Sequence, residues 1–496
     1  MNKRVLLALG LIVLSSGIIA ALILTRGHNW GDDFAAYILQ ARSLIDGHMD
    51  DFVQRSAFTI EESSWRFGPV IFPWGLPILL APIYAIFGVS LLAFKLLLTL
   101  CYMAFLIAFF FLARTRHTDT ESLLLTAFMA FNLRMFQAQN EILSDLPFLL
   151  WSTLTLVLVE RYLAQSAAAP RNSVCLVGIG LTIFMAAFTR PNGSLLFVPL
   201  AVAQLIRLGQ RAPEGHGASG EVFETLVPYM VFGICYGMQA VLLPNSAVGL
   251  TDQWETLSWG SVWQNLKFYF LLPGDFLRDS KIGGYALYAV LLISFGVALT
   301  RRRRDDAPML LYVLATIALY VIFPLTQGTR YIFPILPVFF LFAFQGMKDA
   351  AGKLRSNLQL RAVTLVCVLW AALAAASLGA SLTDARRNML EGRQEPSGPF
   401  SPAASPMFYF IRNATPADSN IVFFKPRVMR LLTDRDSFLT SNCEDLSKAD
   451  YVVIAKDRRT PNQISPDHLQ DCDASVSLTR VFGKGDFVIY SVSQRP

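Results

Sequence analysis

The segment VSLLAFKLLLTLCYMAFLIAFFFLA, residues 89–113, indicates the fold class of this chain. It carries a single charged residue, Lys95, and it exceeds the roughly 20 apolar residues that an α-helix needs to cross a bilayer. The whole chain of 496 residues has the same character, because only 16% of its residues are charged. Soluble proteins average about 25%. This composition excludes a soluble or disordered protein as the leading interpretation, and we expect a membrane protein.

Ten other apolar segments are candidates for membrane spans, so the sequence predicts an α-helical polytopic protein with eleven transmembrane helices. The first segment begins with Lys3 and Arg4 like a signal peptide. Its apolar run is too long for one and no clear cleavage site follows, so we expect it to be retained. The eleven segments are residues 5–25, 89–113, 121–138, 146–163, 173–189, 193–208, 224–243, 284–300, 307–324, 331–347 and 361–383.

Lysine and arginine are concentrated in alternate loops of this arrangement. The inner segments hold clusters such as Arg301–Arg304, whereas the short outer turns hold only Arg190 and Arg330. Positive loops stay in the cytoplasm, so we expect an inner (cytoplasmic) membrane protein with its N-terminus inside and its C-terminus outside. The net charge of +6 then reflects topology, and no motif indicates a nucleic-acid partner.

The chain divides into a transmembrane domain, residues 1–383, and a polar C-terminal part, residues 384–496. The transmembrane domain includes two outer loops, residues 26–88 and 244–283. Short β-type runs in the C-terminal part predict a small periplasmic α/β domain. They are residues 420–424, 451–455 and 486–492.

Two of the six cysteines, Cys443 and Cys472, fall in this outer domain. An oxidising compartment favours a disulfide between them, and two unpaired thiols are the alternative.

The first outer loop opens with HNWGDDFAAYILQARSLIDG, residues 28–47. Asp32 or Asp33 fits a helix N-cap and Gly47 fits a helix end, which is the purely structural interpretation. Two adjacent carboxylates at the end of a membrane span nevertheless cost free energy unless water hydrates them, cations pair with them or they serve a function. Such a carboxylate could act as a general base, and two together could hold a divalent cation.

Further motifs follow this acidic run in order on the expected outer side. They are the Pro/Gly-rich segment 72–88, the second acidic turn with Glu141 and Asp145, and the arginine turns at Arg190 and Arg330. As an ordered series over most of residues 1–340, these motifs resemble the GT-C superfamily of membrane glycosyltransferases. The similarity is to its bacterial branch, which includes the lipid A aminoarabinose transferases and relatives of the protein O-mannosyltransferases.

The resemblance implies a transferase whose donor is a sugar on a polyprenyl phosphate. The family's acidic residue after the first span maps to Asp33, by its spacing to Tyr37 and Ala41. Many relatives follow this acid with Glu, whereas here Phe34 follows and the second acid, Asp32, precedes it. Which acid acts as base, and whether a divalent metal is bound, therefore stays open. The sequence implies no other cofactor.

A departing phosphate needs cations, and arginine binds it with bidentate, charge-assisted hydrogen bonds. The outer candidates are Arg330, Arg190, Arg66, Lys267 and Arg278. Arg190 and Arg330 lie at span ends, where arginine side chains commonly extend to the membrane surface for structural reasons alone. Lys95, within a span, could extend to the surface in the same way or bind the phosphate. Asp33 would activate the acceptor for direct displacement, with inversion at the anomeric carbon. The acceptor could be a lipid, a glycan or a protein.

The main competing function is a flippase for lipid-linked sugars or another multi-span transporter. It predicts inverted repeats and ionisable groups at the bilayer midplane. Neither is evident in the sequence, in which the outer-side charges gather at the membrane edge.

Overall fold

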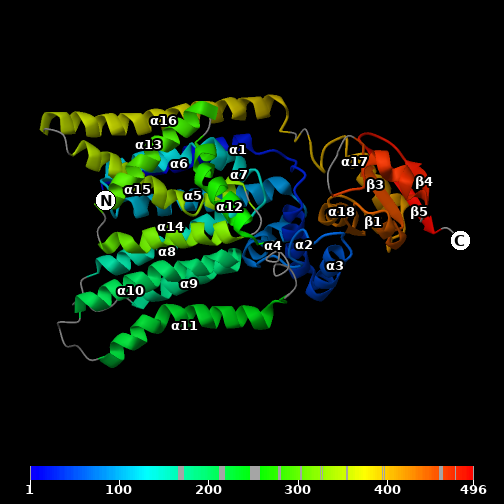
Figure 1. Ribbon diagram of the computed structural model, residues 1–496, viewed down its shortest axis with the longest axis horizontal. Coiled ribbons are helices and arrows are strands. Elements are labelled where there is room, and N and C mark those ends of the chain that lie inside the picture. The colour runs from blue at the N-terminus through cyan, green and yellow to red at the C-terminus, as the bar shows by residue number, and fades with distance from the viewer. Residues whose placement is uncertain are drawn as a thin grey trace.

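The computed structural model describes residues 2–165, 173–211, 218–245, 257–277, 281–301, 304–323, 326, 328–352, 356–393, 395, 397–456, 462–474 and 476–494. A bundle of long helices forms one part, and a small domain of strands and short helices lies beyond one end of it (Figure 1). We call this end of the bundle the domain end. The N-terminus lies at the far end (Figure 1).

Helical structure covers each of the predicted apolar segments. Seven helices in the described ranges are long and apolar enough to cross a membrane. They are α1 (Lys3–Ile23), α5 (Leu91–Ala113), α8 (Asp145–Ala164), α10 (Phe197–Arg211) with the preceding η1 (Pro191–Leu196), α11 (Ala218–Leu242), α14 (Ala307–Ile322) with η3 (Arg304–Asp306), and α16 (Ser356–Leu390). Helices α4 (Gly75–Phe87), α9 (Ser173–Thr189), α13 (Lys281–Thr300) and α15 (Leu336–Ala351) are apolar but shorter or less hydrophobic. The number of eleven crossings stays a prediction.

Two segments differ from the sequence expectation. The predicted span 121–138 is broken into α6 (Asp119–Ala130) and α7 (Leu133–Gln139). The Asn132 side chain accepts hydrogen bonds from the backbone N–H groups of Arg134 and Met135, so an N-cap starts a new helix inside the apolar run.

The outer loop expected at 244–283 contains a helix, α12 (Trp259–Phe276). It packs against α13 and α14 through a buried face that includes Tyr269, Leu272 and Phe276. Asn265 on the same face donates hydrogen bonds to the carbonyls of Val321 and Phe323. Tyr269 is therefore buried on this helix, whereas Trp259, Trp263 and Phe270 are exposed.

The first loop region, residues 26–88, folds into α2 (Asp33–Asp46), α3 (Met49–Glu61) and α4, which lie between the bundle and the C-terminal domain (Figure 1). Gly47 ends α2 in the left-handed conformation, with φ of 72°, as the sequence predicts for a glycine C-cap. Gln40 of α2 makes hydrogen bonds to both the N–H and the carbonyl of Phe72. This pairing fixes the acidic helix against the chain that leads into α4.

The C-terminal domain contains a five-stranded sheet in the order β2-β1-β3-β5-β4. Strands β2, β1 and β3 are parallel, and β3, β5 and β4 are antiparallel. The predicted runs coincide with β1, β3 and β5, whereas the short β2 and the largely exposed β4 were not predicted. The elements are α17 (Ser405–Ala414), β1 (Asn420–Val422), α18 (Pro426–Thr433), β2 (Asp436–Phe438), η5 (Glu444–Lys448), β3 (Tyr451–Ala455), η6 (Pro466–Ala474), β4 (Val476–Phe482) and β5 (Phe487–Gln494).

The domain is docked on the first loop region through apolar and ionic contacts. Trp30 packs among four phenylalanine rings of the domain, with Phe424 the nearest at 5.1 Å between ring centroids. Arg55 of α3 pairs with Asp436 at 2.7 Å. Helix α18 packs on α2, which brings its residues to the acidic start of that helix.

The predicted disulfide is present between Cys443 and Cys472. It joins the start of η5 to η6 across a separation of 29 residues. The other four cysteines, Cys101, Cys175, Cys235 and Cys367, are free thiols in the helices of the bundle.

We expect this disulfide to stabilise the C-terminal domain by about 3–4 kcal/mol, because it closes a loop of moderate length in the unfolded chain. The double variant Cys443→Ser/Cys472→Ser should therefore unfold at a lower temperature, and a reductant should lower the wild-type transition by the same amount. Thermal unfolding of the purified full chain measures both. Cys101→Ser, which removes a free thiol, is the control. A wild-type transition that is insensitive to reductant would contradict the prediction.

Candidate active site

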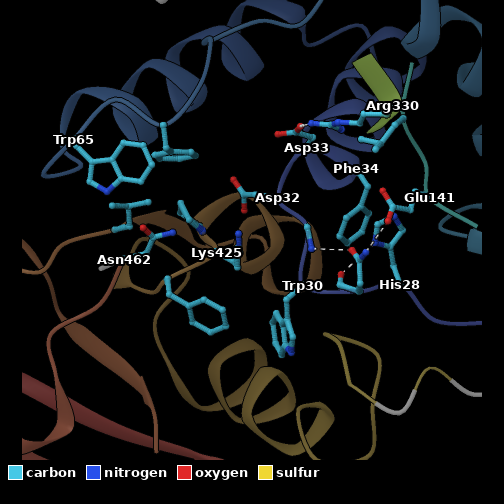
Figure 2. Close-up of a pocket in the computed structure, with 17 residues that line it drawn as sticks. His28, Trp30, Asp32, Asp33, Phe34, Trp65, Glu141, Arg330, Lys425 and Asn462 are labelled. Atoms are coloured by element: carbon cyan, nitrogen blue, oxygen red, sulfur yellow. Dashed lines mark hydrogen bonds and ion pairs between the residues drawn. The ribbon is translucent and has the colours of Figure 1, made fainter. Parts of the chain in front are cut away.

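A cavity with a volume of about 520 Å³ lies at the domain end of the bundle. The bundle and the C-terminal domain both line it (Figure 2). The first loop supplies residues 28–34, the turn before α8 supplies Glu141, and η4 (Thr329–Ile332) supplies Arg330. Lys425 and Asn462 come from the C-terminal domain. The cavity thus joins residues that are far apart in the sequence.

Asp33 and Arg330 face each other on one wall of this cavity (Figure 2). Asp33 is the first residue of α2, and its side chain is 38% exposed. The Arg330 guanidinium lies 3.9 Å from Asp33 Oδ2 and, through its other terminal nitrogen, 3.9 Å from Asp145 Oδ2. An accessible carboxylate at a helix N-terminus and a partly exposed cation therefore share one site.

Behind Arg330 lies a second, more deeply buried ion pair. Arg190 Nη1 donates a hydrogen bond to Asp145 Oδ1, and its guanidinium lies 4.8 Å from the centre of the Tyr331 ring. Neither Arg190 nor Asp145 lines the cavity. Their pairing fixes the carboxylate that Arg330 contacts, so these two residues support the site from behind.

Asp32 occupies a different environment from its neighbour. Its side chain is 8% exposed and lies by the N-terminus of α18, with Arg427 Nε at 3.8 Å. Burial raises the pKa of the Asp32 carboxyl, while the charges of Arg427 and Lys425 and the Val428 amide act in the opposite direction. Neither oxygen reaches full hydrogen-bond geometry with a donor in the described part of the chain.

Arg427 is a site residue that the sequence analysis missed. Its side chain is 4% exposed and comes from α18 of the C-terminal domain, yet its Nη1 lies 3.8 Å from Asp33 Oδ1. Nothing in the local sequence distinguishes it, because the segment PRVMRLLT is typical of an amphipathic helix in a small domain. Only the docking of that helix on α2 reveals the contact.

Glu141 and His28 form the wall beside Arg330 (Figure 2). Asn29 Nδ2 donates a hydrogen bond to Glu141 Oε1 at 3.1 Å, and burial raises the pKa of the Glu141 carboxyl against the opposing charge of Arg330. His28 stacks on Phe34 at 3.9 Å between ring centroids, and its Nε2 accepts a hydrogen bond from the Ile142 N–H. Burial lowers the pKa of His28 to about 4, so the ring is neutral near pH 7.

Lys95, the charge in the opening apolar segment, is fully buried in α5. Its ammonium donates to the carbonyls of Thr25 and Gly27, to the Thr25 hydroxyl and to Asn140 Oδ1, at 2.6–3.1 Å. It does not line the cavity. Lys95 therefore links the segment after α1 to the turn before α8, and both of these segments lead into residues that line the cavity.

The structure separates the predicted site residues into three groups. Asp32, Asp33, Glu141 and Arg330 line the cavity, and Asp145 and Arg190 lie behind it. Arg66 and Lys267 are exposed and line no part of it. The Lys267 ammonium lies 5.1 Å from the Trp263 ring on α12. Arg278 lies outside the described residues.

We expect His28 to make stability pH-dependent. Its pKa falls from 6.5 to about 4 on folding, so its contribution is present above pH 6.5 and is lost as the pH falls from 6.5 towards 4. The loss is on the order of 3 kcal/mol at 1.36 kcal/mol for each pKa unit. Thermal unfolding between pH 7 and 4 should show a shallower pH dependence for His28→Gln than for the wild type. His48→Gln, at an exposed histidine, should keep the wild-type slope. Equal slopes for the two variants would contradict this role of His28.

No protein-family model matches the sequence, and no curated protein matches it either. Solved structures do match. ArnT from Cupriavidus metallidurans, crystallised with undecaprenyl phosphate, matches with a TM-score of 0.58 at 14% identity, over 97% of each chain. The archaeal oligosaccharyltransferase AglB from Archaeoglobus fulgidus, in complex with an inhibitory peptide and a dolichol-phosphate, matches with a TM-score of 0.57 at 11% identity, over 96% of this chain and 74% of that one.

A complex of the A. fulgidus oligosaccharyltransferase with Zn and sulfate also matches, with a TM-score of 0.55 at 11% identity over 96% of this chain and 73% of that one. These matches extend over both the bundle and the C-terminal domain. The chain therefore has the fold of these membrane proteins, which is the fold that the resemblance of its motifs implied.

Proposed function

We propose that this chain is a glycosyltransferase that moves a sugar from a polyprenyl-phosphate carrier to an acceptor hydroxyl or phosphate at the outer face of the cytoplasmic membrane. The observation that carries the proposal is the opposition of Asp33 and Arg330 in a cavity of about 520 Å³ at the end of an apolar bundle. A base for the acceptor and a cation for the leaving group are the two charges that such a transfer needs.

Arg330 is the residue that we assign to the leaving phosphate. Its ion pairs with Asp33 and Asp145 are long, at 3.9 Å, so a phosphate with greater negative charge would compete well for the guanidinium. The undecaprenyl phosphate in the ArnT crystal structure supports a carrier of this class. The apolar helices beside the cavity would accommodate the polyprenyl tail.

Asp33 is the residue that we assign as general base, in preference to Asp32. Asp33 is accessible from the cavity, whereas Asp32 is buried against the C-terminal domain. An acceptor hydroxyl would pass its proton to an Asp33 oxygen while its own oxygen attacks the anomeric carbon. The bond from that carbon to the carrier phosphate breaks, its electron pair leaves with the phosphate, and the anomeric configuration inverts.

Trp65, Lys425 and Asn462 also line the cavity, the last two from the C-terminal domain, and Trp65 and Asn462 lie on the wall away from Arg330 (Figure 2). An aromatic ring beside polar groups suits the binding of a sugar-containing or polar acceptor. We therefore assign acceptor binding to this wall. The acceptor is a lipid, a glycan or a protein segment that approaches along the membrane surface.

Asp33→Asn should reduce sugar transfer at least about 100-fold, because it removes the base while keeping the shape of the side chain. The assay is transfer from a radiolabelled polyprenyl-phosphate sugar to a membrane extract of acceptors in proteoliposomes. Asp46→Asn, at the exposed far end of the same helix, is the matched control and should keep wild-type rates. Asp32→Asn should lose less activity than Asp33→Asn.

An Asp33→Asn protein that folds and transfers at the wild-type rate would refute the assignment of the base. Movement of the labelled lipid across the bilayer without cleavage of the sugar–phosphate bond would instead favour the flippase.

The orientation has a separate test. We expect the N-terminus in the cytoplasm and the C-terminal domain in the periplasm, because the loop between α5 and α6, which holds Arg114 and Arg116, lies at the end of the bundle away from that domain. A reporter that is active only in the periplasm should be active when fused after Pro496, and a cytoplasmic fluorescent reporter fused there should not be. The reverse result would place the cavity on the cytoplasmic side and contradict the proposed topology.

A further inference from the structure

The two adjacent carboxylates at the start of α2 raise the question of a bound metal. One matching oligosaccharyltransferase structure contains Zn, and two neighbouring acids are a plausible start of such a site. In this chain, however, no group of three or more His, Cys, Asp or Glu side chains within the described ranges is placed to hold a metal ion. A protein cation lies beside the two acids: the Arg427 guanidinium is 3.8 Å from Asp32 and 3.8 Å from Asp33.

We propose that Arg427 of the C-terminal domain is the fixed counter-cation of Asp32 and Asp33 and stands where a divalent metal ion would otherwise bind. Arg427 is thus a positioning residue for Asp33, and the reaction depends on the docking of the C-terminal domain and on no divalent metal. This inference rests on the proposed function for the role of Asp33. Its claim about metal binding does not depend on the reaction.

Arg427 is held rigidly in this position. Its Nη2 donates a hydrogen bond to the Pro69 carbonyl at 2.6 Å. The guanidinium packs on the rings of Phe67 and Phe72, at 4.9 and 5.1 Å from their centres. Gly68 lies directly beside it, since a Cβ on Gly68 would stand 3.2 Å from Nη2. A hydrogen bond, two rings and a close backbone therefore surround the cation, and little freedom to move away remains.

The geometry also orients Asp33. Its Oδ1 faces Arg427 and its Oδ2 faces Arg330, at 3.8 and 3.9 Å. One guanidinium comes from the domain and the other from the bundle, so the carboxylate is held between two charges on opposite sides. A base in such an arrangement is positioned for an acceptor that enters from the open part of the cavity.

A divalent ion and Arg427 cannot occupy this place together. Metal ions of this kind bind carboxylate oxygens at about 2.0–2.6 Å, so an ion between Asp32 and Asp33 would lie within a few ångströms of the guanidinium. The repulsion between these like charges is strong because Arg427 and Asp32 are nearly fully buried, at 4% and 8% exposed. Lys425 adds a further positive charge near Asp32. Metal binding at this place should therefore require the loss of Arg427.

The experiment compares Arg427→Met with Arg430→Met in the purified full chain. Arg430 is a matched control, because it is an equally buried arginine one turn along α18. It contacts α3, where it donates to Ser56 Oγ at 2.8 Å and packs on the Phe52 ring. It has no ion pair with the cavity acids among the described residues. Binding of Mn²⁺ is measured by electron paramagnetic resonance and by the shift in unfolding temperature, without any assay of activity.

We expect the wild type and Arg430→Met to bind no Mn²⁺ at the cavity. Arg427→Met should bind Mn²⁺ at least about tenfold more tightly than the weakest affinity that the assay can detect, and Asp33→Asn in the Arg427→Met background should abolish that binding. Arg427→Lys should restore exclusion of the metal. Mn²⁺ binding by the wild type that Asp33→Asn removes would overturn the proposal. So would equal Mn²⁺ affinities for the two methionine variants. The wild-type measurement alone tests the proposal if Arg427→Met does not fold.

Sugar transfer provides the second readout. Wild-type transfer should be unchanged by EDTA, whereas Arg427→Met should lose kcat about tenfold or more with a smaller change in KM, and Arg427→Lys should recover part of kcat. A wild type that loses transfer in EDTA and regains it with Mn²⁺ would overturn the proposal. Absence of transfer in every variant, together with the expected Mn²⁺ results, would instead refute the proposed function and leave the counter-cation assignment intact.

Discussion

The pairing of two adjacent carboxylates with cations from two different parts of the chain is the interaction on which the site depends. Removing a carboxylate from water costs several kcal/mol unless opposite charge compensates it, and Asp32 is almost fully buried. The bundle contributes Arg330 and the C-terminal domain contributes Arg427. The domain is therefore part of the site, because its guanidinium lies 3.8 Å from both acids, and without it Arg330 would remain as the partner of Asp33 while Asp32 would lose its nearest cation.

Contacts outside the cavity fix the positions of these charged residues. Lys95 ties the end of α1 to Asn140, and Tyr37 donates a hydrogen bond to Ser144 one helical turn below Asp33. Trp30 fills an aromatic pocket of the C-terminal domain only two residues before Asp32. The acidic pair is thus fixed from the bundle on one side and from the domain on the other. Long ion pairs of 3.8–3.9 Å persist because the backbone that carries them is held by these stronger contacts.

Much of the architecture could be predicted because it depends on local or compositional signals. The apolar segments coincide with helices, three β-type runs coincide with strands, and Cys443 pairs with Cys472. The differences have local causes as well. Asn132 caps a new helix inside an apolar run, and the aromatic segment 259–276 forms a helix with one buried face. The number of apolar residues in a sequence window predicts neither the helix break at Asn132 nor the buried face of the helix 259–276.

The sequence by itself determined that the bundle is apolar enough for a membrane, that the acids follow the first apolar segment, and that the motifs occur in an order that resembles the GT-C superfamily. These properties follow from hydrophobic length and from residue spacing, which are read along the chain. Only the tertiary structure decided which charges meet. It brought Asp33, Glu141 and Arg330 to one cavity, left Arg66 and Lys267 outside it, and placed Arg427 against the acids. The physical reason is that an ion pair depends on distance in space, and the docking of α18 on α2 sets that distance.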